Sequence, residues 1–336
     1  MKYSIGQGAI YWGLAIMAIM AMIVLNLCVG AYPVSFHDLY GWLLWRSGAA
    51  LTVDENVRVI IENIRAPRII AALVIGAGLS CAGAAYQSLF RNPLVSPDLL
   101  AVSSGAALGA SLSILFSLSF VFLQFGAFLG GVAAVCVVIA IASLARHRDR
   151  ILSLVLAGIV VSSLLGAGVS LVKILADPYE QLPLLTFWLL GSLSRIQNYE
   201  IFPLVPVFII AMGLIIAMHF RIDVMTVGEE EAETLGLNVV RTRLLVIASA
   251  TLLTSAAVSI SGIIGWVGLV VPHMTRMMVG PSFARLGLMS SCVGGLFLLF
   301  VDTIARTLTL VEIPLGILTA LIGAPIFIFL LVKGRT

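Results

Sequence analysis

Residues 125–145 read FGAFLGGVAAVCVVIAIASLA, a run without a single charged side chain. An apolar helix needs roughly 20 residues to cross the hydrocarbon core of a bilayer, so this run predicts a membrane span. Similar runs recur along the chain, and none carries Asp, Glu, Lys or Arg at its centre. They cover residues 9–31, 69–86, 99–122, 125–145, 151–172, 201–218, 244–271, 286–301 and 313–332. This repetition is typical of a polytopic membrane protein.

The composition of the chain agrees with lipid as its solvent. Of its 336 residues, 61% are hydrophobic and only 10% are charged, whereas soluble domains are usually about 25% charged. The segment from residue 244 to 279 is long enough for two spans, broken at Gly262, Gly265, Gly268 and Pro272. The sequence therefore predicts an all-α fold of about ten transmembrane helices, forming one transmembrane domain over residues 1–336.

The loops suggest an orientation for these spans. With this number of spans, the larger share of the 19 Lys and Arg residues falls on the side of the N-terminus. Because cytoplasmic loops are enriched in Lys and Arg, both termini are predicted to lie in the cytoplasm. The four cysteines fall within apolar runs and have no metal-ligand spacing, so we expect neither disulfides nor a metal site or other cofactor.

The sequence also limits the possible sources of energy for any transport. Ion-coupled transporters usually keep ionisable residues at membrane depth, and the span centres here carry none. The chain lacks a G-x-x-x-x-G-K-[ST] phosphate loop, so an ATPase would have to be another polypeptide. An ATP-independent secondary transporter stays open as an alternative, because residues 262–268 could form a broken helix around an ion site. No catalytic arrangement of acids, His, Cys or Ser stands out, so we do not expect an enzyme, and no nucleic-acid partner is predicted.

The loop between residues 228 and 238 reads GEEEAETLGLN. Acids in a first turn complement the positive end of a helix, and Gly236 suits a left-handed helix stop, so a short two-turn helix outside the membrane is predicted. Such a helix could dock a partner. The alternative is an acidic turn that is only hydrated.

Three arginines gather near the opposite side of the membrane. Arg65 and Arg68 open one span, and Arg306 closes another. Their planar guanidinium groups could bind an acidic partner. The alternative is interfacial snorkelling, with Arg306 paired to Asp302 four residues earlier.

Small residues recur at four-residue spacing in the run from 151 to 172. Gly158, Ser162, Gly166 and Ser170 would line one face of a helix. That face could leave room for a passing solute, or it could allow close packing between helices.

Several long motifs occur in order along the chain. They read RAPRIIAALVIGAGLSCAGAAYQSLFRNPLVSPDLLAVSSGAALGA, FWLLGSLS, GLVVPHMTRMMVG, DTIARTL and IPLGILTALIGAPIF. From about Ser35 to the C-terminus the chain resembles the FecCD family of ABC importer permeases, which includes vitamin B12, ferric siderophore and haem permeases. The resemblance implies a ten-helix type II importer architecture in a bacterial cytoplasmic membrane. It also implies two permease subunits, two copies of an ABC ATPase subunit, and an extracytoplasmic substrate-binding protein.

The same resemblance implies roles for particular residues. Arg65, Arg68 and Arg306 match arginines that dock the binding protein, and Gly158, Ser162, Gly166 and Ser170 lie on the helix that lines the translocation pathway. The ATPase coupling helix would comprise Glu229, Glu230, Glu231, Ala232, Glu233, Thr234, Leu235, Gly236 and Leu237. An iron-siderophore chelate is the favoured cargo, with haem, cobalamin and molybdate as alternatives. The second permease subunit would be another copy of this chain or a related one, and we favour the homodimer.

Overall fold

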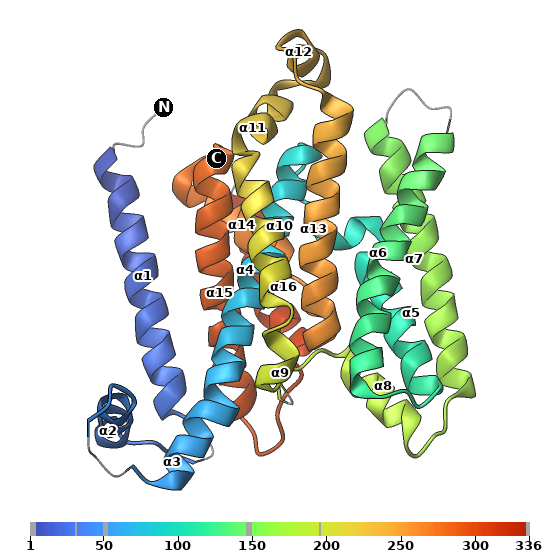
Figure 1. Cartoon of the computed structure of the whole chain (residues 1–336). Helices are drawn as coiled ribbons and strands as arrows, with labels where there is room; N and C mark the ends of the chain where they lie inside the picture. The colour runs from blue at the N-terminus through green and yellow to red at the C-terminus, as the bar shows by residue number, and fades with distance from the viewer. Residues whose placement is uncertain (1–4, 31, 50–52, 146–149, 195, 334–336) are drawn as a thin grey trace.

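The structure is a computed structural model that describes residues 5–30, 32–49, 53–145, 150–194 and 196–333. Within these residues the chain is helical and forms no strand. The helices stand roughly side by side and run between two ends of the molecule (Figure 1). In the first half they are α1 (Ile5–Cys28), α2 (Phe36–Arg46), α3 (Glu55–Val59), η1 (Ile60–Arg65), α4 (Ala66–Leu89), η2 (Pro97–Leu100), α5 (Val102–Leu115), α6 (Phe120–Leu144) and α7 (Arg150–Leu175). In the second half they are α8 (Gln181–Leu189), α9 (Asn198–Ile201), α10 (Val205–Ala217), α11 (His219–Val227), α12 (Glu229–Thr234), α13 (Val239–Ser261), α14 (Val267–Val279), α15 (Phe283–Thr307) and α16 (Leu315–Lys333).

The described helices confirm the polytopic all-α fold. Seven are long and apolar enough to cross a membrane, and α10 with α11 forms a further apolar pair bent by 50°. The apolar helices α5 and α14 are shorter than a full span. Counting the bent pair and the two shorter helices with the seven gives the ten or so elements that the sequence predicts.

Some boundaries differ from the sequence prediction. The apolar run 99–122 is not a single span. Helix α5 ends within it at Leu115, and α6 begins within it at Phe120. Between the predicted spans 9–31 and 69–86 the described residues are largely helical, since they hold α2, α3 and η1. Local capping explains where α2 begins: the Ser35 hydroxyl accepts from the Asp38 amide at 3.1 Å while the Asp38 carboxylate accepts from the Ser35 amide at 3.2 Å.

The break predicted between residues 262 and 272 is real but shorter. Helix α13 ends at Ser261, Gly262 takes a positive φ of 68°, and α14 starts at Val267. Pro272 does not break the helix, because α14 continues on both sides of it.

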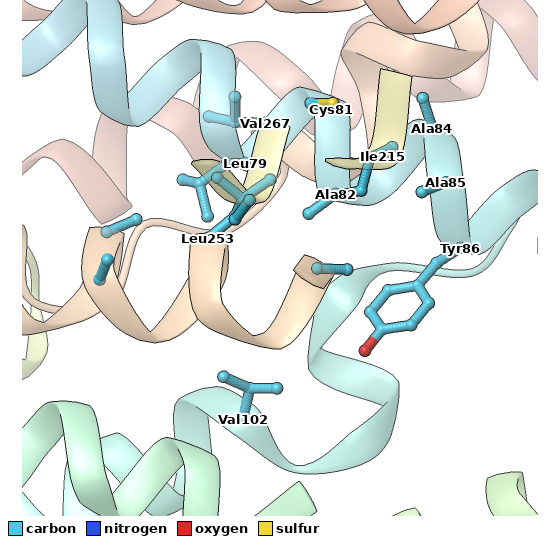
Figure 2. Packing of buried hydrophobic residues seen from close by; sticks show 14 of the residues in the cluster. Leu79, Cys81, Ala82, Ala84, Ala85, Tyr86, Val102, Ile215, Leu253 and Val267 are labelled. Carbon is cyan, nitrogen blue, oxygen red and sulfur yellow. The ribbon is translucent and has the colours of Figure 1, made fainter. Parts of the chain in front are cut away.

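The core of the molecule depends on the close approach of α4 to its neighbours. Helices α4 and α15 share the most extensive contact in the fold. A Cβ on Gly76 would overlap the carbonyl oxygen of Gly294 in α15, and one on Gly83 would overlap that of Gly268 in α14. Figure 2 shows the adjoining apolar packing around Leu79 and Leu253. Small residues therefore permit helix contacts that larger side chains would prevent.

The two ends of the molecule carry different features. Helix α12 projects at one end, and the first turn of α1 and the last turn of α16 lie toward that same end (Figure 1). Helices α2 and α3 lie at the opposite end (Figure 1). The chain termini themselves, for which we predict a cytoplasmic location, lie outside the described residues.

Candidate functional site

Three arginines from three different elements meet at the end opposite α12. Arg65 closes η1, Arg68 lies in the first turn of α4, and Arg306 lies in the last turn of α15. Together with Asp302 and Glu312 they line a cavity of about 210 Å³. We call these five residues the arginine cluster. Three guanidinium groups against two carboxylates leave the cluster with one net positive charge.

Arg65 binds the last turn of α1 and the chain that follows it. Its buried guanidinium donates to the carbonyl oxygens of Leu27 and Tyr32. Gly30 makes this approach possible, because a Cβ there would lie 2.7 Å from the Arg65 Nη2 atom. The π-helical turn η1 directly precedes the start of α4, and such turns often occur at functional sites.

Arg306 ties α15 to the end of α1. Its Nη2 atom donates to the Asn26 carbonyl oxygen at 3.0 Å and to Asn26 Oδ1 at 2.7 Å, and its Nη1 atom donates to the Val29 carbonyl oxygen at 2.6 Å. The predicted pairing with Asp302 is present only at the limit of an ion pair, with Nε 3.9 Å from Oδ2.

Arg68 is the residue that Asp302 binds most closely. The Arg68 Nε atom lies 2.9 and 3.0 Å from the two oxygens of Asp302. Its Nη1 and Nη2 atoms donate to Glu312 at 2.8 and 3.0 Å. Arg68 therefore joins α4 to α15 and to the segment that leads into α16, through two carboxylates arranged around one fork.

The sequence predicted that these arginines lie on one side of the membrane, but it did not predict most of the groups that bind them. The motifs placed Arg65, Arg68 and Arg306 on the same side, and the structure gathers them around one cavity. Glu312 and the carbonyl groups between Asn26 and Tyr32 were not foreseen. One signal could have found Glu312, since it and Asp302 are the only acids after Glu233.

The segment 228–238 forms the predicted helix outside the apolar runs. Helix α12 starts at Glu229 with three acids in its first turn. It ends in a Schellman motif: the Leu237 amide donates to the Ala232 carbonyl at 3.0 Å, the Gly236 amide donates to Glu233 at 2.9 Å, and Gly236 has φ 81°. The left-handed stop predicted at Gly236 is therefore confirmed.

One acid of α12 is bound within the chain and the others face outward. The Glu229 carboxylate pairs with the buried Arg243 in the first turns of α13. The remaining polar positions and one large apolar side chain are exposed. They are Glu230, Glu231, Glu233, Thr234 and Leu235.

The four-residue stripe on α7 divides into a packed part and an open part. Gly158 is buried, and a Cβ there would overlap the carbonyl oxygen of Leu99. Ser162 is half-buried, whereas Gly166 is exposed with nothing within 4 Å of a Cβ, and the exposed Ser170 donates to the Gly166 carbonyl at 3.0 Å. The stripe therefore serves helix packing at one end and faces open space at the other.

Comparison with known proteins identifies the family. The FecCD transport family matches residues 18–333. This chain belongs to the FecCD transport family. Its relatives include the molybdate import system permease protein MolB of Haemophilus influenzae, 38% identical over 326 residues, which cover 96% of this chain and 95% of MolB. The cobalamin import system permease protein BtuC of Halobacterium salinarum is 41% identical over 280 residues, covering 83% of this chain and 75% of BtuC.

The fold of this FecCD protein has a solved counterpart. A metal-chelate type ABC transporter in an inward-facing conformation superposes with a TM-score of 0.87 at 34% identity, covering 97% of this chain and 99% of that one. In this family member, no group of three or more His, Cys, Asp or Glu residues within the described ranges is placed to hold a metal ion.

Proposed function

We propose that this FecCD protein is the permease subunit of an ATP-driven importer for a metal chelate, delivered by an extracytoplasmic binding protein. The observation that carries the proposal is that the two ends of the molecule carry surfaces of opposite charge. A capped acidic helix, α12, projects at one end, and the positively charged arginine cluster lies at the other (Figure 1). A permease between an ATPase and a binding protein needs two such docking ends.

Helix α12 is proposed to couple this chain to the ATPase. Its exposed acids and Leu235 offer a mixed acidic and apolar surface. The Glu229–Arg243 ion pair and the contact of α12 with α11 and α13 connect that surface to the bundle. Motion of a bound ATPase would therefore be passed to the spans through packed elements.

The arginine cluster is proposed to receive acidic groups of the binding protein. Arg65 and Arg306 are held mainly by carbonyl and amide oxygens. These neutral partners do not cancel the guanidinium charge, so the cluster keeps a positive field at the outer end. Such a field favours an acidic docking surface.

The open part of the α7 stripe is proposed to line the translocation pathway. Gly166 and Ser170 leave a small, uncharged surface at that face. A second permease subunit, most simply another copy of this chain, would supply the facing wall. We propose a ferric siderophore as the cargo, with haem, cobalamin and molybdate as the alternatives. Relatives named for molybdate and for cobalamin support a family with a broad range of cargo.

The decisive experiment is uptake into proteoliposomes. They would hold this chain with the ATPase encoded nearest to it, and the binding protein would be added outside together with a ferric siderophore, haem, cobalamin or molybdate. We expect uptake of one of these that requires ATP and all three proteins. Uptake by this chain alone, driven by an ion gradient and indifferent to ATP, would contradict the proposal.

Docking at the arginine cluster is tested separately with Arg306→Gln. We expect the binding protein to bind this variant at least about tenfold more weakly, since a lost charged contact is worth roughly 1.5–3 kcal/mol. Arg58→Gln is the matched control, because Arg58 lies on the same side but pairs with Glu55 outside the cluster. A melting temperature of each variant without the binding protein separates lost docking from lost structure. Equal affinity of Arg306→Gln and the unaltered protein would exclude the cluster as the docking site.

One observation favours the secondary transporter as a second candidate. The Asp98 carboxylate lies in a small cavity beside the break between α13 and α14, which Trp266 also lines. However, Asp98 accepts a hydrogen bond from Ser103, and the cavity of about 10 Å³ is at the lower limit for one water molecule. We therefore expect Asp98→Asn to keep ATP-dependent uptake within about threefold of the unaltered protein. Loss of uptake in a folded Asp98→Asn protein, together with pH-dependent uptake by the unaltered protein, would favour ion coupling at Asp98 instead.

A further inference from the structure

We propose that Glu312 is an internal substitute for a partner carboxylate at Arg68 and that docking displaces it. The proposal rests on the function proposed above, in which an acidic binding protein docks at the arginine cluster. It adds that the free permease keeps its own carboxylate at one docking arginine and exchanges it for that of the partner.

The first step of the argument is that Arg68 has no free edge. Asp302 occupies the Nε edge at 2.9 and 3.0 Å, and its Oδ1 atom also lies 2.8 Å from Nη2. Glu312 occupies the outer edge through Nη1 at 2.8 Å and Nη2 at 3.0 Å. A guanidinium offers five N–H donors in a fixed plane. A third carboxylate can bind Arg68 in this way only if one of the two present leaves.

Glu312 is the carboxylate that can leave. The side chain of Asp302 is 1% exposed and lies within α15, whereas that of Glu312 is 39% exposed. Glu312 belongs to the connection between α15 and α16, which has no regular helical structure. Removing Asp302 would leave Arg68 buried without its inner partner, and that is costly. Rotating Glu312 outward places a carboxylate in water, and an incoming carboxylate replaces it.

The surroundings of Glu312 fit this exchange. Just before it, Leu308, Leu310 and Val311 are exposed large apolar side chains. Just after it, the Ile313 amide donates to the Ala305 carbonyl at 3.1 Å and the Leu315 amide donates to Gly191 at 2.8 Å. The backbone beyond Glu312 is therefore anchored, and the exposed turn before it presents apolar surface for a partner to cover.

The exchange also preserves charge. With Glu312 in place the cluster has one net positive charge, and replacing one carboxylate with another restores the same balance. The buried Arg68 is therefore paired in both states. Because the partner must compete with a carboxylate already held in the chain, Glu312 weakens docking and makes release easier.

The test compares Glu312→Gln with Glu55→Gln. Both variants remove one negative charge at the same end of the molecule, but Glu55 pairs with Arg58 and lies outside the cluster. The probe is the binding protein encoded beside this permease, with its affinity measured on the full chain in lipid nanodiscs. We expect Glu312→Gln to bind about tenfold more tightly and Glu55→Gln to stay within twofold. Unchanged or weaker binding by Glu312→Gln, or equal tightening by both variants, would overturn the proposal.

A second measurement follows the displacement itself. We expect amide hydrogen exchange across residues 308–312 to change when the binding protein is added to the unaltered chain, and to change less in Glu312→Gln. Arg306→Gln separates the two levels of the argument. If it binds the binding protein normally, the docking site itself is wrong and the exchange fails with it; if it loses binding while Glu312→Gln gains none, only the exchange is wrong.

Discussion

At the scale of single residues, glycine decides how closely the helices of this protein approach. Gly83 faces the backbone of Gly268, and Gly76 faces that of Gly294. A side chain at these positions would meet a carbonyl group, which cannot rotate away as a flexible side chain can. Elsewhere the same residue type faces open space, as Gly213 does in α10. Whether a glycine is needed for close packing therefore depends on the surface that it faces.

This contrast gives a prediction at the residue scale. Gly83→Ala should lower the melting temperature in detergent, since overpacking a close contact costs about 1–3 kcal/mol. The matched control is Gly213→Ala, which should leave the melting temperature unchanged or raise it slightly, because Ala is favoured over Gly in a helix by roughly 0.5–1 kcal/mol. The same ordering should appear in the fraction that remains monodisperse after heating. A Gly83→Ala protein as stable as the Gly213→Ala protein would show that α4 and α14 are not in close contact.

At the scale of elements, α12 shows how a six-residue helix can persist outside a membrane bundle. Isolated helices of this length are unstable in water. Here the acids of the first turn complement the helix dipole, the Schellman motif completes the last turn, and Glu229 binds Arg243 of α13. Ala232 lies on the buried face of the helix. The element is therefore stabilised at both ends and on one face, while its outer face stays available.

The corresponding prediction compares two neighbouring acids. Glu229→Gln removes the carboxylate from the buried Arg243 and should destabilise α12 by about 1–3 kcal/mol. Amide exchange of residues 229–237 should then be faster by up to roughly a hundredfold, since about 1.4 kcal/mol corresponds to a factor of ten. Glu230→Gln, at an exposed position with the same charge change, should leave exchange nearly unaltered. Equal exchange rates in the two variants would mean that the ion pair does not hold α12.

At the scale of the whole molecule, the features that we connect with function are separated by the length of the bundle. The turns that enter α1 and leave α16 lie toward the end that carries α12, and α2 and α3 lie at the other (Figure 1). The uneven distribution of Lys and Arg between the loops predicts that the α12 end lies in the cytoplasm. With that orientation, the two proposed docking surfaces would face opposite sides of the membrane.

That assignment is testable by labelling in intact cells. The native cysteines would first be replaced by Ser or Ala, and Leu235→Cys on the α12 end would be compared with Leu310→Cys after α15, both at exposed positions. We expect a membrane-impermeant thiol reagent to label position 310 from outside and position 235 only after the membrane is opened. Labelling of position 235 in intact cells would reverse the orientation and exclude α12 as an ATPase coupling element.

The sequence by itself determined the class of the fold, the break after α13, the helix at 228–238 and the grouping of three arginines on one face. Each follows from local chemistry: apolar runs long enough to cross a bilayer, acids and glycine at helix ends, and charged residues at the ends of spans. Two features were missed. The loop between α5 and α6 is short and uncharged, so hydropathy does not separate it from the helices. The helices between residues 36 and 65 depend on capping contacts, which composition does not reveal.

Only the tertiary structure decided which group each arginine binds. Arg68 and Glu312 are 244 positions apart in the chain, and no local pattern connects them. Their pairing exists because small residues bring α4 against α15, and because the segment before α16 folds back along the Ala305 and Gly191 carbonyl groups. Sequence fixes which charges are present near one face, whereas the packing of distant helices fixes which of them are already satisfied and which are left for a partner.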